Sequence, residues 1–213
     1  MRLICAAVRE ELLPLLESSL WSESEPGRFY SRRRPCLLAA LGVGLVDFVA
    51  GFEALLRTQP IASAIFTGSC GVYAAALSSW PPVTLVSPGN AILGDLAEAE
   101  GKGYFPGPLA TALTLDEKLS RQLSSGYGTR CLTLAAITSE EQAAARLEAH
   151  YQAHFEQMEA YAFARICRRH RLSGAMLLAV VNQVGVHGHQ QWLVNAARGA
   201  QACAARLREV LAL

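Results

Sequence analysis

Apolar and polar residues alternate along the chain in blocks that are typical of strands followed by helices. Residues 3–8 form a short apolar run, and residues 10–20 then repeat leucine at helical spacing. Another buried strand is predicted at 61–67, where Gly68-Ser69-Cys70-Gly71 ends the run. Further strand-length apolar runs lie at 83–87, 131–137 and 174–181, and helical patterns lie at 114–124, 140–149, 159–170 and 190–211.

A hairpin is predicted between residues 28–33 and 36–41, which flank Arg34-Pro35, and a helical stretch ending near Arg57 follows Gly42-Val43-Gly44. This alternation predicts an α/β fold: one domain, residues 1–213, with three α/β/α layers around a central mixed sheet. Ligands of such sheets bind where loops leave the carboxyl ends of the strands. Chemistry is therefore expected in the loops after Val8, Thr67, Ile137, Phe155 and Val181.

Composition and charge exclude several classes of protein. The 19 basic and 18 acidic residues nearly cancel, so no global field attracts nucleic acid or an anionic membrane. The longest stretch free of charge and strong polarity, 37–46, is too short to span a bilayer, and the first apolar run is too short for a signal peptide. The six cysteines lie far apart without a C-x-x-C pair, so reduced thiols in the cytoplasm are expected, with no metal site.

Polar residues stand out where three apolar strands stop. Glu10-Glu11 follows the first strand, Glu156-Gln157-Met158-Glu159 precedes a helix, and Asn182 comes directly after Ala179-Val180-Val181. Each has a purely structural explanation: glutamates complement a helix dipole or cap a helix, and asparagine favours turns.

Taken together, these motifs resemble a known superfamily. Glu11 ahead of a leucine-rich helix, Gly42-Val43-Gly44, Thr67 to Gly71, Met158-Glu159-Ala160 and Asn182 are similar, in order and over nearly the whole chain, to the nucleoside phosphorylase/nucleosidase superfamily. The spacing of Ile137, Met158-Glu159, Asn182 and Trp192 resembles methylthioadenosine/S-adenosylhomocysteine nucleosidase. Asp95-Leu96 with Glu98, Gly103-Tyr104-Phe105-Pro106, and Asn182-x-Val184 resemble the futalosine hydrolase family more closely.

The resemblance implies hydrolysis of the N-glycosidic bond of a purine nucleoside, with futalosine or aminofutalosine of a menaquinone pathway as the expected substrate. It implies that Glu11 activates water, Glu159 accepts hydrogen bonds from the ribose hydroxyls, and Asn182 faces the purine. An amide donates a hydrogen bond but delivers no proton, which favours hypoxanthine as the leaving base. The substrate-binding residues that the resemblance implies are Ser69, Gly71, Phe105, Ile137, Met158 and Trp192.

Hydrolysis is favoured over phosphorolysis because no Arg or Lys occurs between Arg57 and Lys102, and Arg9 alone stands near the first loop. Phosphate binding requires several fixed cationic donors. The resemblance also implies a homodimer, in which related nucleosidases contribute an aromatic residue across the interface, and no organic cofactor.

Other functions stay open at this point. Val181, His187 and His189 stand where futalosine hydrolases carry Ser and Arg, so a methylthioadenosine-type nucleosidase, a purine nucleoside phosphorylase or a nucleoside-binding paralogue without turnover are alternatives. If the two histidines meet a substrate carboxylate, they do so only when protonated, which predicts a pH-sensitive KM between pH ~6 and ~8. Cys70 paired with His187 or His189 is a further candidate, as a cysteine nucleophile.

Overall fold

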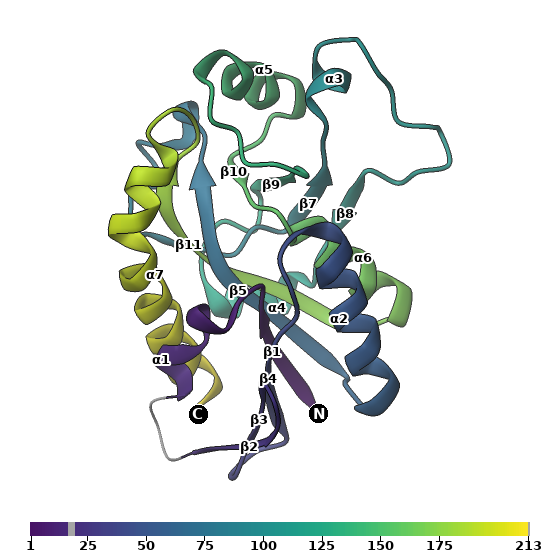
Figure 1. The fold of residues 1–213 in the computed structure, drawn as a ribbon, viewed down its shortest axis with the longest axis vertical. Helices are drawn as coiled ribbons and strands as arrows, with labels where there is room; N and C mark the ends of the chain where they lie inside the picture. Colours follow the sequence, from purple (N-terminus) through teal and green to yellow (C-terminus); the bar gives the residue numbers. More distant parts are fainter. Residues whose placement is uncertain (17–19, 213) are drawn as a thin grey trace.

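The chain folds into one mixed β-sheet that carries helices on both faces (Figure 1). This computed structural model describes residues 1–16 and 20–212. The strands are β1 (Arg2–Ala6), β2 (Trp21–Glu25), β3 (Arg28–Ser31), β4 (Cys36–Ala40), β5 (Ser63–Val72), β6 (Leu85–Val86), β7 (Asn90–Leu93), β8 (Ala112–Thr114), β9 (Arg130–Thr133), β10 (Phe155–Glu156) and β11 (Ser173–Gln183). The helices are α1 (Leu13–Leu16), α2 (Gly44–Thr58), α3 (Leu96–Ala99), α4 (Glu117–Leu123), α5 (Glu141–Tyr151), α6 (Ala160–His170) and α7 (Gly188–Leu211), with 3-10 turns η1 (Arg9–Glu11) and η2 (Ala74–Ala76).

Strand β5 is the centre of the sheet. The strand order is β2-β3-β4-β1-β5-β10-β9-β7-β8, and β11 pairs with both β5 and β6. Strands β1 and β11 run parallel to β5, whereas β10 runs antiparallel to it. The carboxyl ends of β1, β5 and β11 therefore meet at one edge, and the predicted mixed sheet is confirmed.

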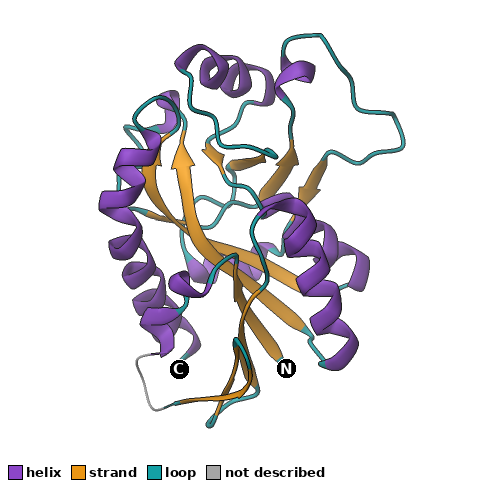
Figure 2. Ribbon diagram, in the orientation of Figure 1, coloured by secondary structure: helices purple, strands orange, loops and turns teal. Residues whose placement is uncertain are grey.

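Both faces of the sheet are buried, which explains why its strands appear as continuous apolar runs. On β11, Met176, Leu178 and Val180 pack in the cluster that includes α2 and α6. The alternate residues of β11, from Ala175 to Val181, pack with α1, α4 and α7. The helices thus form a layer on each side of the strands, as predicted (Figure 2). Within the described ranges, no helix combines the length and the apolarity that crossing a membrane requires.

The helix predicted at 10–20 is confirmed only at Leu13–Leu16. The chain forms the 3-10 turn η1 and then the single turn α1, and Leu20 lies in a turn, while positions 17–19 lie outside the described residues. Proline is tolerated only in the first turn of a helix, so Pro14 places the start of α1 at Leu13. This break leaves Glu11 outside the helix.

Two predicted strand ends are also wrong. Strand β5 does not stop at Thr67 but continues through Gly68–Gly71 to Val72, paired with β10 on one side and β11 on the other. Strand β11 continues to Gln183 with a bulge between Val180 and Asn182, so Asn182 lies in the strand and not in a turn after it.

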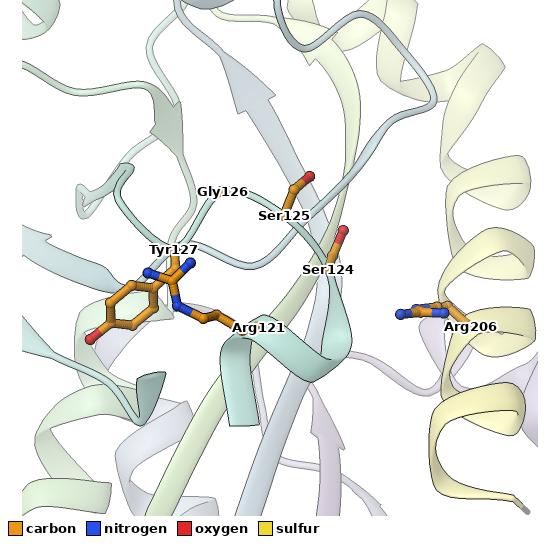
Figure 3. A pocket seen from close by; sticks show the side chains of 6 residues that line it. All are labelled: Arg121, Ser124, Ser125, Gly126, Tyr127 and Arg206. Carbon is orange, nitrogen blue, oxygen red and sulfur yellow. The ribbon is translucent and has the colours of Figure 1, made fainter. Parts of the chain in front are cut away.

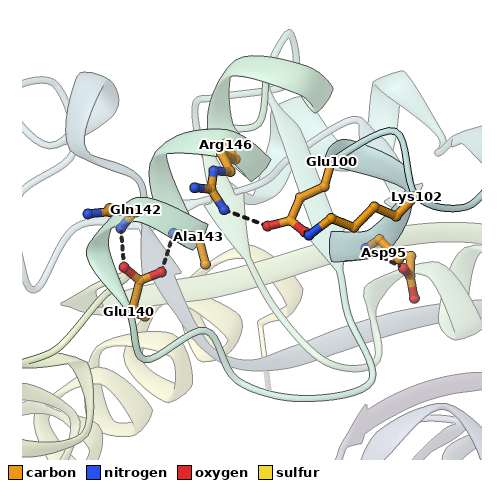
Figure 4. Close-up of polar contacts among 8 residues, drawn as sticks. Asp95, Glu100, Lys102, Glu140, Gln142, Ala143 and Arg146 are labelled. Carbon is orange, nitrogen blue, oxygen red and sulfur yellow. Dashed lines mark hydrogen bonds and ion pairs between the residues drawn. The ribbon is translucent and has the colours of Figure 1, made fainter.

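Helix α5 is held at the edge of the sheet by polar contacts at its start and along one side (Figure 4). The side chain of Glu140 accepts hydrogen bonds from the backbone N–H groups of Gln142 (3.1 Å) and Ala143 (2.7 Å), which caps the helix. Arg146 of α5 and Lys102 both pair with Glu100, which follows α3. These contacts fix the C-terminal end of loop 134–140, which borders the cavity described below.

Candidate active site

A cavity of about 310 Å³ opens at the shared carboxyl edge of β1, β5 and β11. Its walls come from the turn after β1, the end of β5, loop 134–140, the segment between β10 and α6, and the first turn of α7. Residues far apart in sequence meet there, and all but one of the predicted site residues line it: Glu11, Ser69, Gly71, Ile137, Met158, Glu159, Asn182 and Trp192.

A second hollow of about 480 Å³ lies beside α4, and its arginines already have protein partners (Figure 3). Arg206 donates to the carbonyls of Leu123 (2.7 Å) and Gln122 (3.0 Å), where it caps the C-terminal end of α4. Arg121 pairs with Glu117 at 2.8 Å. Because these cations stabilise the fold and no group in the hollow converges on a common point, the smaller cavity is the better candidate for chemistry.

Glu11 projects from η1 toward the end of β5. Its Oε1 atom accepts hydrogen bonds from the backbone N–H (3.1 Å) and the hydroxyl (3.4 Å) of Ser69. Gly68 leaves room for this contact, since a Cβ there would lie 2.8 Å from Glu11 Oε1. Oε2 is buried without a hydrogen bond of ordinary geometry among the described residues, and the backbone N–H groups of Ala7 and Val8 lie near enough to lower the pKa of the carboxyl. Glu11 is thus anchored through Oε1.

Burial raises the pKa of Glu11 from its ordinary 4.5 to about 7; the backbone N–H of Ser69 opposes this rise, and the negative charge of Glu159 adds to it. A carboxyl that titrates near neutral pH is suited to accept a proton at the pH at which enzymes work. Both carboxylates line the same cavity.

Glu159 also lines the cavity and lies immediately before α6. Its Oε1 accepts a 2.6 Å hydrogen bond from the backbone N–H of Gly44, whose φ of +78° few residues other than glycine adopt. Its Oε2 accepts from the side-chain amide of Gln157. Burial raises the pKa of Glu159 and these two donors lower it.

Gln157 was not predicted as a site residue, and it replaces Glu159 as the helix cap. Its Oε1 accepts hydrogen bonds from the backbone N–H groups of Glu159 and Ala160, both at 2.6 Å. Glu159 occupies the N-cap position, but its own side chain makes no capping bond. The capping explanation for Glu159 is therefore wrong, and its carboxylate is turned into the cavity instead.

Asn182 forms a third wall near the end of β11. Its Nδ2 atom donates a 2.9 Å hydrogen bond to the carbonyl of Gln183. Two glycines make room for the amide: a Cβ at Gly71 or Gly188 would lie 3.0 or 3.1 Å from Nδ2. The position of Asn182 in β11 and its hydrogen bond to Gln183 hold the amide at the cavity, and the two glycines leave the space that it occupies.

Loop 134–140 is held by the buried carboxylate of Glu156, a glutamate for which the sequence offered only a role in capping a helix or complementing its dipole. Glu156 accepts hydrogen bonds from the Thr138 backbone N–H (3.0 Å), the Thr138 hydroxyl (2.8 Å) and the Tyr73 hydroxyl (2.6 Å). Ile137, the residue before Thr138, lines the cavity with its side chain 68% exposed. Glu156 therefore fixes the backbone of the segment predicted to contact the purine.

Phe105 is the predicted site residue that the cavity does not include. It lies in the long loop between α3 and β8, which projects away from the sheet (Figure 1). Sequence order gave no information about the direction of this loop. Of the two histidines considered with Asn182, His189 lines the cavity and His187 does not.

The alternative of a cysteine nucleophile has little physical support. Cys70 touches the cavity but is buried, and burial raises its pKa well above the ordinary value, which disfavours the reactive thiolate. We expect Cys70→Ala to retain turnover in a nucleoside hydrolysis assay, whereas loss of a true nucleophile costs about 10⁶-fold. An inactive but folded Cys70→Ala protein would reinstate the cysteine mechanism.

Charged groups in the cavity are almost all acidic. No Lys or Arg is among the residues that line it in the described part of the chain. Arg9, the cation closest in sequence to Glu11, is exposed and lies 5.4 Å from the centre of the Phe29 ring. Among the described residues, no group of three or more His, Cys, Asp or Glu side chains could hold a metal ion.

Comparisons with known proteins agree with this geometry. A family model described as the Phosphorylase superfamily matches residues 5–212. Futalosine hydrolase of Thermus thermophilus is 30% identical over 177 residues, which cover 78% of this chain and 77% of that protein.

Solved structures share the fold. The native structure of futalosine hydrolase of Helicobacter pylori superposes with a TM-score of 0.85 at 14% identity, covering 99% of this chain and 97% of that chain. A 5'-methylthioadenosine/S-adenosylhomocysteine nucleosidase from Helicobacter pylori with butyl-thio-DADMe-Immucillin-A has a TM-score of 0.86 at 13% identity, with the same coverage. The resemblance stated from the motifs is confirmed.

Proposed function

The chain belongs to the Phosphorylase superfamily, and from that premise we propose that it is a nucleosidase, an enzyme that hydrolyses the N-glycosidic bond of a purine nucleoside. One observation carries the proposal: Glu11, Glu159 and Asn182, which are far apart in sequence, line a single cavity.

The chemistry of the bond explains why these groups suit it. As the ribosyl C–N bond breaks, positive charge develops on the sugar and negative charge on the base. Glu159 accepts the ribose hydroxyl hydrogen bonds and stabilises the cationic sugar, with Met158 against the ring. Glu11 orients a water and takes its proton, as glycosidase carboxylates do. Asn182 donates a hydrogen bond to the departing purine.

Hydrolysis is preferred over phosphorolysis because the cavity lacks the side chains that bind phosphate. Holding a phosphate nucleophile requires fixed cationic donors, and the lining contains carboxylates, amides and a single histidine, His189. The three acidic side chains that line the cavity, Glu11, Glu156 and Glu159, would repel a phosphate dianion. Water is the nucleophile that this set of groups accommodates.

We propose futalosine or aminofutalosine as the substrate. The 30% identical futalosine hydrolase supports this choice, and so does Asn182, whose amide can donate to hypoxanthine but cannot protonate a base. His189 at the cavity wall is placed to meet a negatively charged 5′-substituent when protonated.

The deciding experiment incubates the purified protein with futalosine, aminofutalosine, methylthioadenosine, adenosylhomocysteine and inosine, each with and without phosphate. We expect free base to appear without phosphate, fastest from futalosine or aminofutalosine. Preference for methylthioadenosine would reassign the substrate, strict phosphate dependence would indicate a phosphorylase, and binding without turnover would indicate a nucleoside-binding paralogue.

We also propose that the enzyme acts as a homodimer in the cytoplasm. Several large apolar side chains on segments bordering the cavity are exposed: Val43 by 52%, Val46 by 80%, Val186 by 59% and Leu193 by 63%. Clustered exposed apolar residues mark interaction surfaces. A second copy would cover them, and Phe105 could then contribute to its partner's site. We expect light scattering to give a molar mass twice that of the monomer. A monomer mass at the concentration used for activity assays would contradict the proposal.

A further inference from the structure

Trp192, from the first turns of α7, makes a polar contact as well as lining the cavity. Its indole Nε1 donates to Ser69 Oγ at 3.3 Å, and Ser69 Oγ donates to Glu11 Oε1 at 3.4 Å. Three groups from α7, β5 and η1 therefore form one chain of hydrogen bonds. Hydrogen bonds in catalytic sites often shorten when substrate binds, so these lengths are compatible with function.

The direction of this chain follows from the chemistry of its ends. An indole N–H can only donate, and an ionised carboxylate can only accept. A serine hydroxyl between them must accept from the indole and direct its own proton to the carboxylate. With Trp192 in place, the Ser69 hydroxyl therefore stabilises the charged form of Glu11, in addition to the Ser69 backbone N–H at 3.1 Å.

We propose that Trp192 is a positioning residue for the general base: its indole N–H orients the Ser69 hydroxyl so that Glu11 is held ionised and in place. This inference rests on the proposed role of Glu11 in nucleoside hydrolysis. Trp192 would then act on Glu11 through Ser69, in addition to any contact that it makes with the substrate.

Replacing Trp192 adds or removes no charge, so the titratable groups that face Glu11 are the same residues in the variant and in the wild type. Glu159 faces it across the cavity, His189 lines the cavity from α7, and Cys203 of α7 lies behind it. Burial raises the pKa of Cys203 to about 12, so this thiol carries no charge at neutral pH. A change in the titration of Glu11 on removing the indole N–H can therefore be assigned to the hydrogen-bond chain.

The kinetic test compares Trp192→Phe, Ser69→Ala and the double variant. Phenylalanine preserves an aromatic ring beside His189, whose ring centroid lies 6.0 Å from that of Trp192, and removes the indole N–H together with the five-membered ring. Trp192 is 41% exposed, so the variant should fold. We expect the acidic limb of kcat/KM to move up by about half to one pH unit, which lowers kcat/KM about three- to tenfold at pH ~6 and little at pH ~8.5.

The double variant shows whether Trp192 acts on Glu11 through the Ser69 hydroxyl or independently of it. Without the Ser69 hydroxyl, Trp192 has no path to Glu11, so the double variant should shift no further than Ser69→Ala. Trp80→Phe, which removes an indole that packs on Phe155 at 5.8 Å, should leave the limb unmoved. A Trp192→Phe limb that coincides with the wild type, or additive shifts in the double variant, would overturn the proposal.

A second readout needs no substrate, so it remains informative if no tested nucleoside is cleaved. A protonated histidine beside an indole quenches its fluorescence, so the measurement is made in a His189→Gln background. There, tryptophan fluorescence should titrate with a midpoint near the Glu11 pKa of about 7. The transition should vanish when either Glu11→Gln or Trp192→Phe is added. A transition that survives Glu11→Gln would show that Trp192 does not sense that carboxylate.

Discussion

Replacing Glu11 with glutamine should lower kcat for base release by about 10²- to 10⁴-fold, the usual contribution of a positioned general base. Glutamine keeps the hydrogen bond from the Ser69 backbone but cannot take a proton from water. The measurement is chromatography of the released purine at pH ~8. Glu10→Gln is the matched control, because Glu10 is exposed and does not line the cavity. Near-normal turnover in Glu11→Gln would remove Glu11 from the mechanism.

The same carboxyl predicts opposite effects of pH on activity and on stability. Because the active form is ionised, kcat/KM should fall as pH drops below about 7, the pKa of Glu11. The folded state binds this proton more tightly than the unfolded chain, where the pKa is near 4.5, so this group's contribution to stability falls as pH rises between those values. Over that pH range, the contribution of Glu11 to the free energy of unfolding falls by about 3 kcal/mol. Glu11→Gln lacks this cost and should melt at a higher temperature than the wild type at pH ~8; an unchanged or lower melting temperature would contradict the assignment.

Replacing Glu159 with glutamine is expected to lower kcat by about 10²- to 10³-fold, since it removes the negative charge that faces the developing cation. The amide would also place a donor against the donors of Gly44 and Gln157. Substrate affinity should fall less than kcat, because the charge on the sugar arises mainly in the transition state. Steady-state kinetics of Glu159→Gln beside Glu100→Gln, a surface carboxylate paired with Lys102 and Arg146, tests this. A raised KM with kcat unchanged would indicate simple ribose binding.

The sequence predicted those elements whose hydrophobic pattern is unambiguous. Strands β1 and β11 are buried on both faces and α7 carries a long helical pattern, and all three were predicted. Strand β2, with the sequence WSESE, was missed because it lies at the edge of the sheet and is largely exposed. Strand β7 was missed because its run is short. Such strands are defined by their partners, which local sequence does not specify.

Most of the candidate site could also be predicted, but its supporting residues could not. Glu11, Glu159 and Asn182 stand at strand ends and match family motifs. Gln157 and Glu156 resemble ordinary helix-start residues in sequence. Their roles appear only in the structure, where Gln157 donates to Glu159 and Thr138 donates to Glu156.

Glycine-rich segments were the other source of error. Gly68 and Gly71 suggested a turn, yet both lie in β5, where they admit the side chains of Glu11 and Asn182. A glycine required for close approach cannot be distinguished by sequence from one required for a turn.

The central claim is that both carboxylates and the amide act on one bound nucleoside, and a crystal structure of Glu11→Gln with futalosine bound tests it most directly. We predict that the ribose hydroxyls lie within hydrogen-bond distance of Glu159, the purine against Asn182, and residue 11 on the face of the sugar opposite the base. A nucleoside bound outside this cavity, or one whose ribose contacts neither residue 11 nor Glu159, would contradict it.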